Sequence, residues 1–429
     1  MIRIILIRHG RTAWNVDEGQ GERFRGLTDL PLAEEGVAQA QITARRLANT
    51  PLTAIYSSPL QRAFRTAQII AEPHGLAVHP LPGLGSMNYG EWAGRTYAEV
   101  ASRWPELYQK WRHDPFSIRI PGGESTVELR DRAVAAVQEV LNRHRDGETI
   151  VLISHQVVTR TLVCTLAGLP NVSCWRVRQD LCNLSRFDYE PTTGTFVVVG
   201  LNDTCHLRPT LTQGASRGLR IVLVRHGQTA WNAPLDIAGA KGGREERFRG
   251  HTDLPLDDTG HDQARAVAER LKNETFTALY TSPLLRARQT LAPLAEALGL
   301  PVQPHSGLLD VDYGDFQGLS VSETAAAYPE LYTLWRTAPG RVRFPGGESL
   351  AEVQIRLQSL LDELATRHPG GTVALVGHQI VNKVLACTLL GLDLDQIWRV
   401  QMDTAGVSVF EQVDGIWYTH CLNDTCHLR

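Results

Sequence analysis

The residues best suited to chemistry lie in a motif that the chain contains twice. The sequence RHGRTAWN begins at Arg8, and RHGQTAWN begins at Arg225. An arginine side chain presents a planar fork that matches phosphate oxygens. A neutral imidazole, here His9 or His226, can attack phosphorus and carry the phosphoryl group covalently. An isolated Arg-His pair is commonly structural, but a long motif that occurs twice favours a phosphate-handling site.

Each copy of the motif comes with a second arginine and a second histidine. Arg62 and Arg286 follow a Ser-Pro-Leu sequence, while His155 and His378 follow apolar runs late in each half. Two arginines, two histidines and a helix N-terminus would form a pocket for a dianion. The cations would stabilise the charge on a phosphoryl group during in-line transfer, and a carboxylic acid would protonate the leaving alcohol. Because arginine can supply the electrostatic role, we expect neither a metal nor a cofactor.

The repetition extends over the whole chain of 429 residues. RFRG, PELY, PGGES and LNDTCHLR each occur twice, at a spacing of more than 200 residues that is too long for a solenoid unit. We therefore predict two domains, 1–208 and 218–429, joined by a polar linker at 209–217. An insertion rich in Gly and charge at 233–246 is expected to form a mobile loop over the second site.

Strands and helices alternate in the predicted domains, which indicates an α/β fold with a mostly parallel sheet. Residues 2–7, 149–154 and 372–377 are apolar runs typical of buried strands. Ser58-Pro59 is expected to cap a helix reaching about residue 74, and Ser125 and Ser349 begin capping boxes of helices of about 20 residues. Ligands of such sheets bind beyond the carboxyl ends of the strands, where His9 and His155 should meet.

Composition excludes several classes of protein. With 43 basic and 46 acidic residues, the chain lacks the basic excess of a nucleic-acid-binding protein. No apolar run is long enough for a signal peptide or a transmembrane helix, so no membrane partner is expected. Seven cysteines without CxxC spacing favour a reduced, cytoplasmic protein over a disulfide framework or a zinc ribbon. Cys205-His206 and Cys426-His427 give too few ligands per site for a metal.

These motifs together resemble the histidine phosphatase superfamily, in its phosphoglycerate-mutase-like branch. The resemblance covers nearly the whole chain twice and implies two tandem three-layer α/β/α domains with helices on both faces of each sheet. It also implies a phosphorylated nucleophile at His9 and His226. The other implied site residues are the phosphate clamps Arg8, Arg62 and His155, and Arg225, Arg286 and His378, with phosphate contacts at Asn15 and Asn232 and pocket edges at Thr28 and Thr252.

The two halves differ where the family pattern places its proton donor. Three residues before a Tyr-Gly pair, the first half has Ser86 and the second has Asp310. A serine hydroxyl does not act as an acid near neutral pH, so the first domain is expected to be impaired and the second active. Glu22 or Glu91 would be the candidates to replace the missing acid.

The sequence therefore predicts a metal-independent phosphatase that acts on small phosphorylated metabolites through a phosphohistidine. A phosphoglycerate mutase is one alternative, although each half is short for a mutase. A phosphate-ligand sensor with a non-catalytic first domain is another. The tandem repeat also makes an intramolecular pseudo-dimer an expectation.

Overall fold

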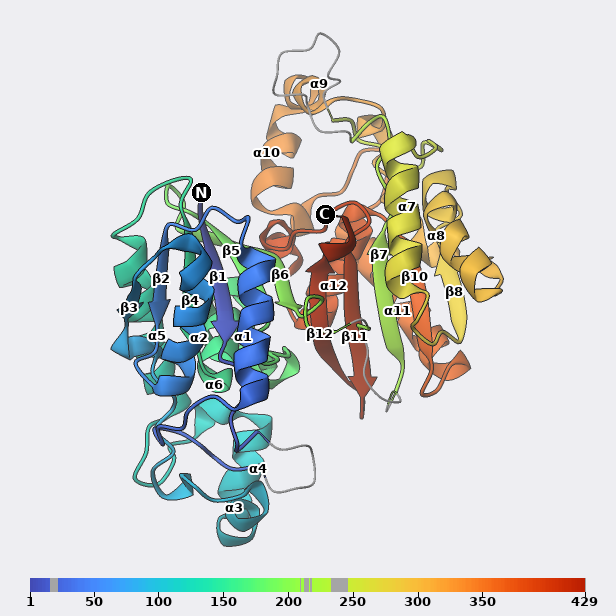
Figure 1. The fold of residues 1–429 in the computed structure, drawn as a ribbon. Helices are drawn as coiled ribbons and strands as arrows, with labels where there is room; N and C mark the ends of the chain where they lie inside the picture. Colours follow the sequence, from blue (N-terminus) through green and yellow to red (C-terminus); the bar gives the residue numbers. More distant parts are fainter. Residues whose placement is uncertain (16–21, 209, 212–215, 217, 233–245, 429) are drawn as a thin grey trace. The chain divides into compact units, whose positions relative to one another are not determined.

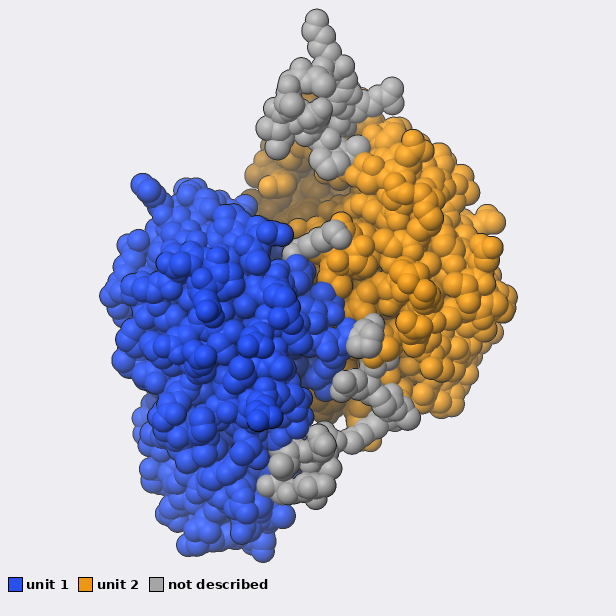
Figure 2. Space-filling model, in the orientation of Figure 1, with its two compact units in different colours: residues 1–208 blue, residues 209–429 orange. Residues whose placement is uncertain are grey.

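The computed structural model describes residues 1–15, 22–208, 210–211, 216, 218–232 and 246–428. The chain divides into two compact units, Met1–Arg208 and Pro209–Arg429, which Figure 2 distinguishes by colour. Most of the predicted linker and residues 233–245 of the predicted loop lie outside the described residues. Among the described helices, none is long and apolar enough to cross a lipid bilayer.

The first unit is built on a six-stranded sheet in the order β3-β2-β4-β1-β5-β6. Strands β3, β2, β4 and β1 are mutually parallel, whereas β5 pairs antiparallel with both β1 and β6. The predicted α/β class with a mostly parallel sheet is therefore confirmed. The strands are β1 (Ile2–Arg8), β2 (Ala54–Ser57), β3 (Val78–Pro80), β4 (Thr149–Ser154), β5 (Leu184–Glu190) and β6 (Thr195–Asp203).

Helices cover both faces of this sheet, as expected for three layers (Figure 1). Ile5 and Ile7 pack on one face with apolar residues of α1 and α2. Ile4 and Leu6 alternate with them, point to the other face and are also buried, where α6 contacts β1. The helices are α1 (Glu34–Leu47), α2 (Gln61–Ala71), α3 (Tyr97–Arg103), α4 (Pro105–His113), α5 (Thr126–Leu141) and α6 (Gln156–Ala167).

The second unit repeats this arrangement, with its own strands in the order β12-β11-β7-β10-β8-β9. Its strands are β7 (Arg220–Arg225), β8 (Ala278–Thr281), β9 (Val302–Pro304), β10 (Thr372–Gly377), β11 (Val407–Val413) and β12 (Ile416–Asp424). Its helices are α7 (Asp258–Leu271), α8 (Leu285–Leu298), α9 (Val321–Ala327), α10 (Pro329–Thr337), α11 (Leu350–Arg367) and α12 (Gln379–Leu390).

The predicted helix start at Ser58 is wrong. Helix α2 begins at Gln61, with Leu60 at its N-cap and no side-chain cap, and after Ala71 the chain continues as a 3₁₀ turn to His74. The Ser58 hydroxyl instead accepts a hydrogen bond from the Leu60 amide and bonds with the ring of His155. Ser58 therefore serves as the polar partner of the buried His155 ring and does not cap the helix. The capping boxes at Ser125 and Ser349 are confirmed, although their helices are shorter than predicted, at 16 and 18 residues.

A close backbone contact fixes the loop that follows β7. A Cβ atom on Gly260, near the start of α7, would lie 2.1 Å from the carbonyl oxygen of Gln228. The amide of Gly227 donates to the Thr290 hydroxyl of α8 at 2.9 Å, which ties the same loop to a second helix. Glycine is required here because backbone meets backbone.

We expect Gly260→Ala to displace this loop and to destabilise the second unit. Overpacking of this kind costs about 1–3 kcal/mol. Thr259→Ala, at the exposed neighbouring position of α7, serves as the control. Urea unfolding should show a lower midpoint for Gly260→Ala than for the control, and equal midpoints would contradict the contact.

Candidate active site

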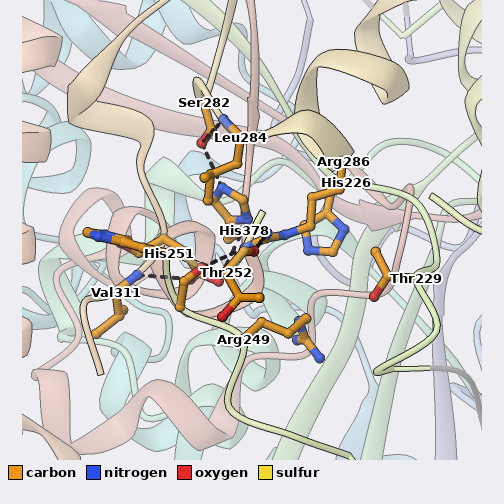
Figure 3. Close-up of polar contacts among 12 residues, drawn as sticks. His226, Thr229, Arg249, His251, Thr252, Ser282, Leu284, Arg286, Val311 and His378 are labelled. Atoms are coloured by element: carbon orange, nitrogen blue, oxygen red, sulfur yellow. Dashed lines mark hydrogen bonds and ion pairs between the residues drawn. The ribbon is translucent and has the colours of Figure 1, made fainter. Parts of the chain in front are cut away.

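The two histidines of the second unit meet at the carboxyl ends of neighbouring parallel strands. His226 follows β7 and His378 follows β10, and these strands pair in parallel. The His226 amide donates to the Gly377 carbonyl at 3.0 Å, and the two ring centroids lie 5.2 Å apart. Both side chains are fully buried. The predicted convergence of the histidines at one sheet edge is therefore present (Figure 3).

The hydrogen bonds of His226 determine which of its nitrogens can react. Its Nδ1 lies 2.7 Å from the Gly227 carbonyl oxygen, which only accepts hydrogen bonds. Nδ1 therefore carries the proton, and Nε2 carries a lone pair. Within the described part of the chain, Nε2 is buried and has no hydrogen-bond partner. His378, by contrast, uses its Nε2 to bond with the Ser282 hydroxyl at 2.8 Å.

The two predicted arginines are anchored by main-chain carbonyl groups. Arg225 donates to the Met402 carbonyl at 2.7 Å, and Arg286 donates to the Thr252 and Gly250 carbonyls at 2.8 and 2.9 Å. In both guanidinium groups, Nε is buried and has no hydrogen-bond partner among the described residues. Burial lowers the pKa of Arg225 to about 10, so its guanidinium stays charged at neutral pH.

A third arginine of the pocket, Arg249, was missed by the sequence analysis. Its side chain is buried, and its carboxylate partner is Glu246 at 3.4 Å. Its charge depresses the pKa of His226 and of His378, which places it within electrostatic reach of both rings. The repetition of RFRG in both halves was the available signal, since it contains Arg25 and Arg249 at equivalent positions.

Burial keeps the imidazoles of this pocket neutral. Loss of hydration is the largest cause that lowers the pKa of His226 and His378, and the charge of Arg286 is the next. Both pKa values lie well below the ordinary 6.5. A neutral imidazole is the form that can act as a nucleophile.

Asp310 places its carboxylate at the edge of the same pocket. Its Oδ2 lies 3.1 Å from Nη2 of Arg286 and 3.7 Å from Nδ1 of His378. The main chain of Asp310 is held as well, because His251 and Arg356 hydrogen-bond to its carbonyl oxygen at 3.0 and 3.2 Å. A carboxyl group so placed can exchange a proton with a group bound between the arginine and the histidines.

The asparagine and threonine positions support the clamp in different ways. The Asn232 amide oxygen accepts from the amide and the hydroxyl of Thr229 at 2.7 and 2.9 Å. Its Nδ2 group is buried with no hydrogen-bond partner in the described residues, so it is available as a donor. Thr252 acts through its main chain, since its carbonyl oxygen accepts the hydrogen bond from Arg286.

The first unit contains the same cluster around His9 and His155, whose ring centroids are also 5.2 Å apart. His9 Nδ1 lies 2.7 Å from the Gly10 carbonyl oxygen. The other predicted residues take equivalent positions: Arg8 donates to the Gln179 carbonyl, Arg62 donates to the Thr28 and Gly26 carbonyls, and Asn15 accepts from Thr12.

Ser86 lines this first cavity together with His9, Arg62 and His155, at the place that Asp310 takes in the second unit. The candidate replacements for the missing acid have other partners. Glu91 is exposed and lies 3.8 Å from Arg103, and Glu22 pairs with Arg25 at 3.3 Å. Among the described residues that line this cavity, none is a carboxylate.

The repeated Cys-His segment near the end of the first unit is packed against other elements. Asp203, Cys205 and His206 have ligand atoms within 4.8 Å of one another. However, the His206 ring bonds with the Thr43 hydroxyl and the Cys182 carbonyl, while Arg46 and Arg186 lie 3.7 and 3.4 Å from Asp203. Two guanidinium groups at the carboxylate disfavour a cation there.

Comparison with known proteins agrees with the geometry of both pockets. The model of the histidine phosphatase superfamily (branch 1) matches residues 4–204 and 221–425. The chain therefore belongs to this superfamily, with two tandem copies of its domain.

Several relatives in the superfamily carry a named activity. Phosphoserine phosphatase 1 of Hydrogenobacter thermophilus is 35% identical over 49% of this chain and 94% of its own. The 2-carboxy-D-arabinitol-1-phosphatase of Triticum aestivum is 25% identical over 99% of this chain and 86% of its own. A probable phosphoglycerate mutase of Yersinia pestis is 37% identical over 48% of this chain and 95% of its own. Family and relatives together place the chain among the phosphoric monoester hydrolases.

The depressed histidine pKa values give a pH dependence of stability. In the unfolded chain these imidazoles bind protons near pH 6.5, whereas in the folded state they stay neutral to a lower pH. The unfolded state therefore binds more protons below that pH, and the free energy of unfolding falls as the pH decreases from about 6.5. Each such group contributes at most about 1.4 kcal/mol per pH unit.

We expect His378→Gln to make this dependence shallower, because one of the buried imidazoles is removed. Urea unfolding at a series of pH values between about 7.5 and 5.5 measures the free energy of unfolding of the starting protein and of the variant. A slope that is the same in both proteins would contradict the neutral, buried state of His378.

Proposed function

We propose that the second unit is a metal-independent phosphatase that hydrolyses small phosphomonoesters through a phosphohistidine at His226. One observation carries this proposal: the lone pair of His226 Nε2 faces no hydrogen-bond partner in the described residues, within a pocket of buried arginines. Such a nitrogen is prepared to form a bond with phosphorus rather than to serve a structural hydrogen bond.

The proposed reaction assigns a role to each of these side chains. Arg225, Arg249 and Arg286 neutralise the phosphate dianion, and His226 Nε2 attacks phosphorus as the P–O bond to the alcohol breaks. Asp310, as a carboxylic acid, gives its proton to the leaving oxygen. In the second step, the Asp310 carboxylate takes a proton from water, the water oxygen bonds to phosphorus, and the P–N bond breaks. Inorganic phosphate and the free imidazole are the products.

The first unit, in this proposal, binds phosphate but transfers it slowly. It has the nucleophile and the clamp, yet Ser86 supplies no acid at the leaving group. Esters whose alcohol leaves without protonation are the substrates that it would still hydrolyse. A phosphate-sensing role for this unit is consistent with a pocket that holds the ligand and lacks the acid.

The relatives support small phosphorylated metabolites as substrates. Those named above are called phosphatases of phosphoserine and of 2-carboxy-D-arabinitol 1-phosphate, and a probable phosphoglycerate mutase. Because one relative is named a probable mutase, we retain phosphoryl transfer to a second hydroxyl group as the alternative to hydrolysis. In that reaction the phosphohistidine would give its phosphoryl group to an alcohol instead of water.

Trapping of the intermediate tests the proposal directly. The full chain, mixed briefly with a ³²P-labelled phosphomonoester and quenched in alkali, should carry acid-labile label on His226. The label should disappear in His226→Ala and persist in His9→Ala. Absence of label together with absence of turnover would contradict the proposal, and release of label onto added alcohols rather than water would favour the mutase.

The carboxylate difference between the units predicts a reciprocal pair of variants. Asp310→Ser should reduce kcat for alkyl phosphates by about 10²–10⁴-fold, the usual contribution of a general acid. The loss should be much smaller for p-nitrophenyl phosphate, because nitrophenolate leaves without a proton. These kcat values are measured in a chain whose first unit is inactivated by His9→Ala.

Ser86→Asp, introduced with His226→Ala, is the matched gain-of-function variant in the first unit. It should raise turnover of ethyl phosphate more than turnover of acetyl phosphate, a small substrate whose acetate leaves without a proton. Equal losses of Asp310→Ser on both esters would exclude Asp310 as the proton donor.

A further inference from the structure

A chamber lies next to the phosphate site of the second unit, because its lining includes Arg249 of that site. A cavity of about 140 Å³ begins beside the phosphate site at Arg249 and Gln379, the residue after His378. On the order of ten water-sized positions fit into such a volume, which is enough for an organic ring. The chamber is lined by three arginines, Arg247, Arg249 and Arg336, and by the aromatic residues Phe248, Tyr313, Tyr332, Trp335 and Trp398.

These walls are held in place by contacts among themselves. Trp335 is buried, and its carbonyl oxygen accepts a hydrogen bond from the Trp398 indole at 2.9 Å. The two rings meet edge to face, with centroids 5.1 Å apart, and Tyr313 contacts Trp335 in the same way at 6.3 Å. Because the aromatic walls are packed, the chamber exists before a ligand binds.

The first unit has nearly the same side chains around its pocket, with one decisive difference. Phe24, Tyr89, Tyr108, Trp111 and Trp175 stand at the aromatic positions, and Arg112 stands at the position of Arg336. Where the second unit has Val321, however, the first has Tyr97. Each is the first residue of its helix, α9 or α3, directly after the N-cap residue of a capping box, so the two side chains start from equivalent places.

Tyr97 occupies the space beside the first phosphate site. Its ring centroid lies 4.7 Å from that of Phe24, and it lines a cavity of only about 30 Å³ together with His9 and Arg62. Burial raises the pKa of Tyr97 to about 12, so the phenol remains neutral and does not repel a bound phosphate. Two or three water-sized positions fit into this cavity, which contains the phosphate site itself, so the room beside that site is small.

We propose that the residue at this helix start sets substrate size: Val321 admits phosphomonoesters with a ring-bearing alcohol into the second unit, and Tyr97 restricts the first to phosphate and small esters. The proposal rests on the phosphatase function above. Aromatic walls favour the ring of the alcohol through stacking and through removal of its apolar surface from water. Arg336 lies at the side of the chamber, where a polar or acidic substituent of that ring would find a partner.

Turnover of two alkyl esters measures this selection. Ethyl phosphate and 2-phenylethyl phosphate differ in size but have similar leaving groups, so protonation by Asp310 affects both alike. In a chain carrying His9→Ala, Val321→Tyr should lower the ratio of kcat/KM for the phenylethyl ester to that for the ethyl ester at least tenfold. Ala326→Tyr adds the same side chain to an exposed position of α9 and should leave the ratio unaltered. An equal ratio in Val321→Tyr and Ala326→Tyr would overturn the proposal.

Binding of the corresponding phosphonates tests the chamber without relying on catalysis. By titration calorimetry, the unmodified chain should bind ethylphosphonate at two sites and 2-phenylethylphosphonate at one. Tyr97→Val should create an additional binding site for 2-phenylethylphosphonate in the first unit. Val321→Tyr should remove the binding site for 2-phenylethylphosphonate in the second unit. Two sites for 2-phenylethylphosphonate in the unmodified chain, or one in Tyr97→Val, would overturn the proposal. If these stoichiometries are found and no phosphomonoester is hydrolysed, the proposed catalytic function fails while the assignment of the chamber stands.

Discussion

The structure of each site depends on keeping two guanidinium groups charged in a buried place. In the first unit, Arg8 and Arg62 are almost entirely removed from water, and their side chains donate hydrogen bonds to main-chain carbonyl groups. Carbonyl dipoles compensate only part of the lost hydration, and burial lowers the pKa of both arginines to about 10. In the proposed function, a dianion between them would restore the missing counter-charge, so that the cost of burying the cations would contribute to affinity for phosphate.

The strands and loops around the arginines place the two histidines beside them. Strands β1 and β4 run in parallel and end side by side, which presents His9 and His155 at one edge. The loop after β1 must then turn close to the start of α1, and a Cβ on Gly36 would lie 2.1 Å from the Arg11 carbonyl oxygen. The histidines contribute to the cluster by remaining neutral, since two further positive charges would make it unstable without a ligand.

Much of this arrangement could be predicted from the sequence because the repeat identifies the motifs and apolar runs identify the strands. The partners that anchor the arginines could not be predicted, since main-chain carbonyls such as those of Gln179 and Met402 carry no signature in the side-chain sequence. The role of Ser58 was misassigned for a related reason: a serine before Pro is typical of a cap, and only the fold shows that the ring of His155 lies within reach of its hydroxyl. The chamber was missed because the sequence does not show that Tyr97 and Val321, each at the start of a short helix, line a pocket.

Three differences between the two units concern residues at or near the site. At the leaving group, Asp310 corresponds to Ser86; behind it, His251 bonds to the Asp310 main chain where the first unit has the exposed Leu27; and in the chamber, Val321 corresponds to Tyr97. The cationic clamp, in contrast, is the same in both. In the proposed function, a unit that retains the buried arginines while it lacks both the acid and the room for a large alcohol would keep what is needed to hold phosphate itself. The clamp and the residues proposed to face the alcohol are therefore separable parts of this fold. Buried charge determines the clamp, whereas a carboxylate and the size of one side chain determine which alcohol is accepted.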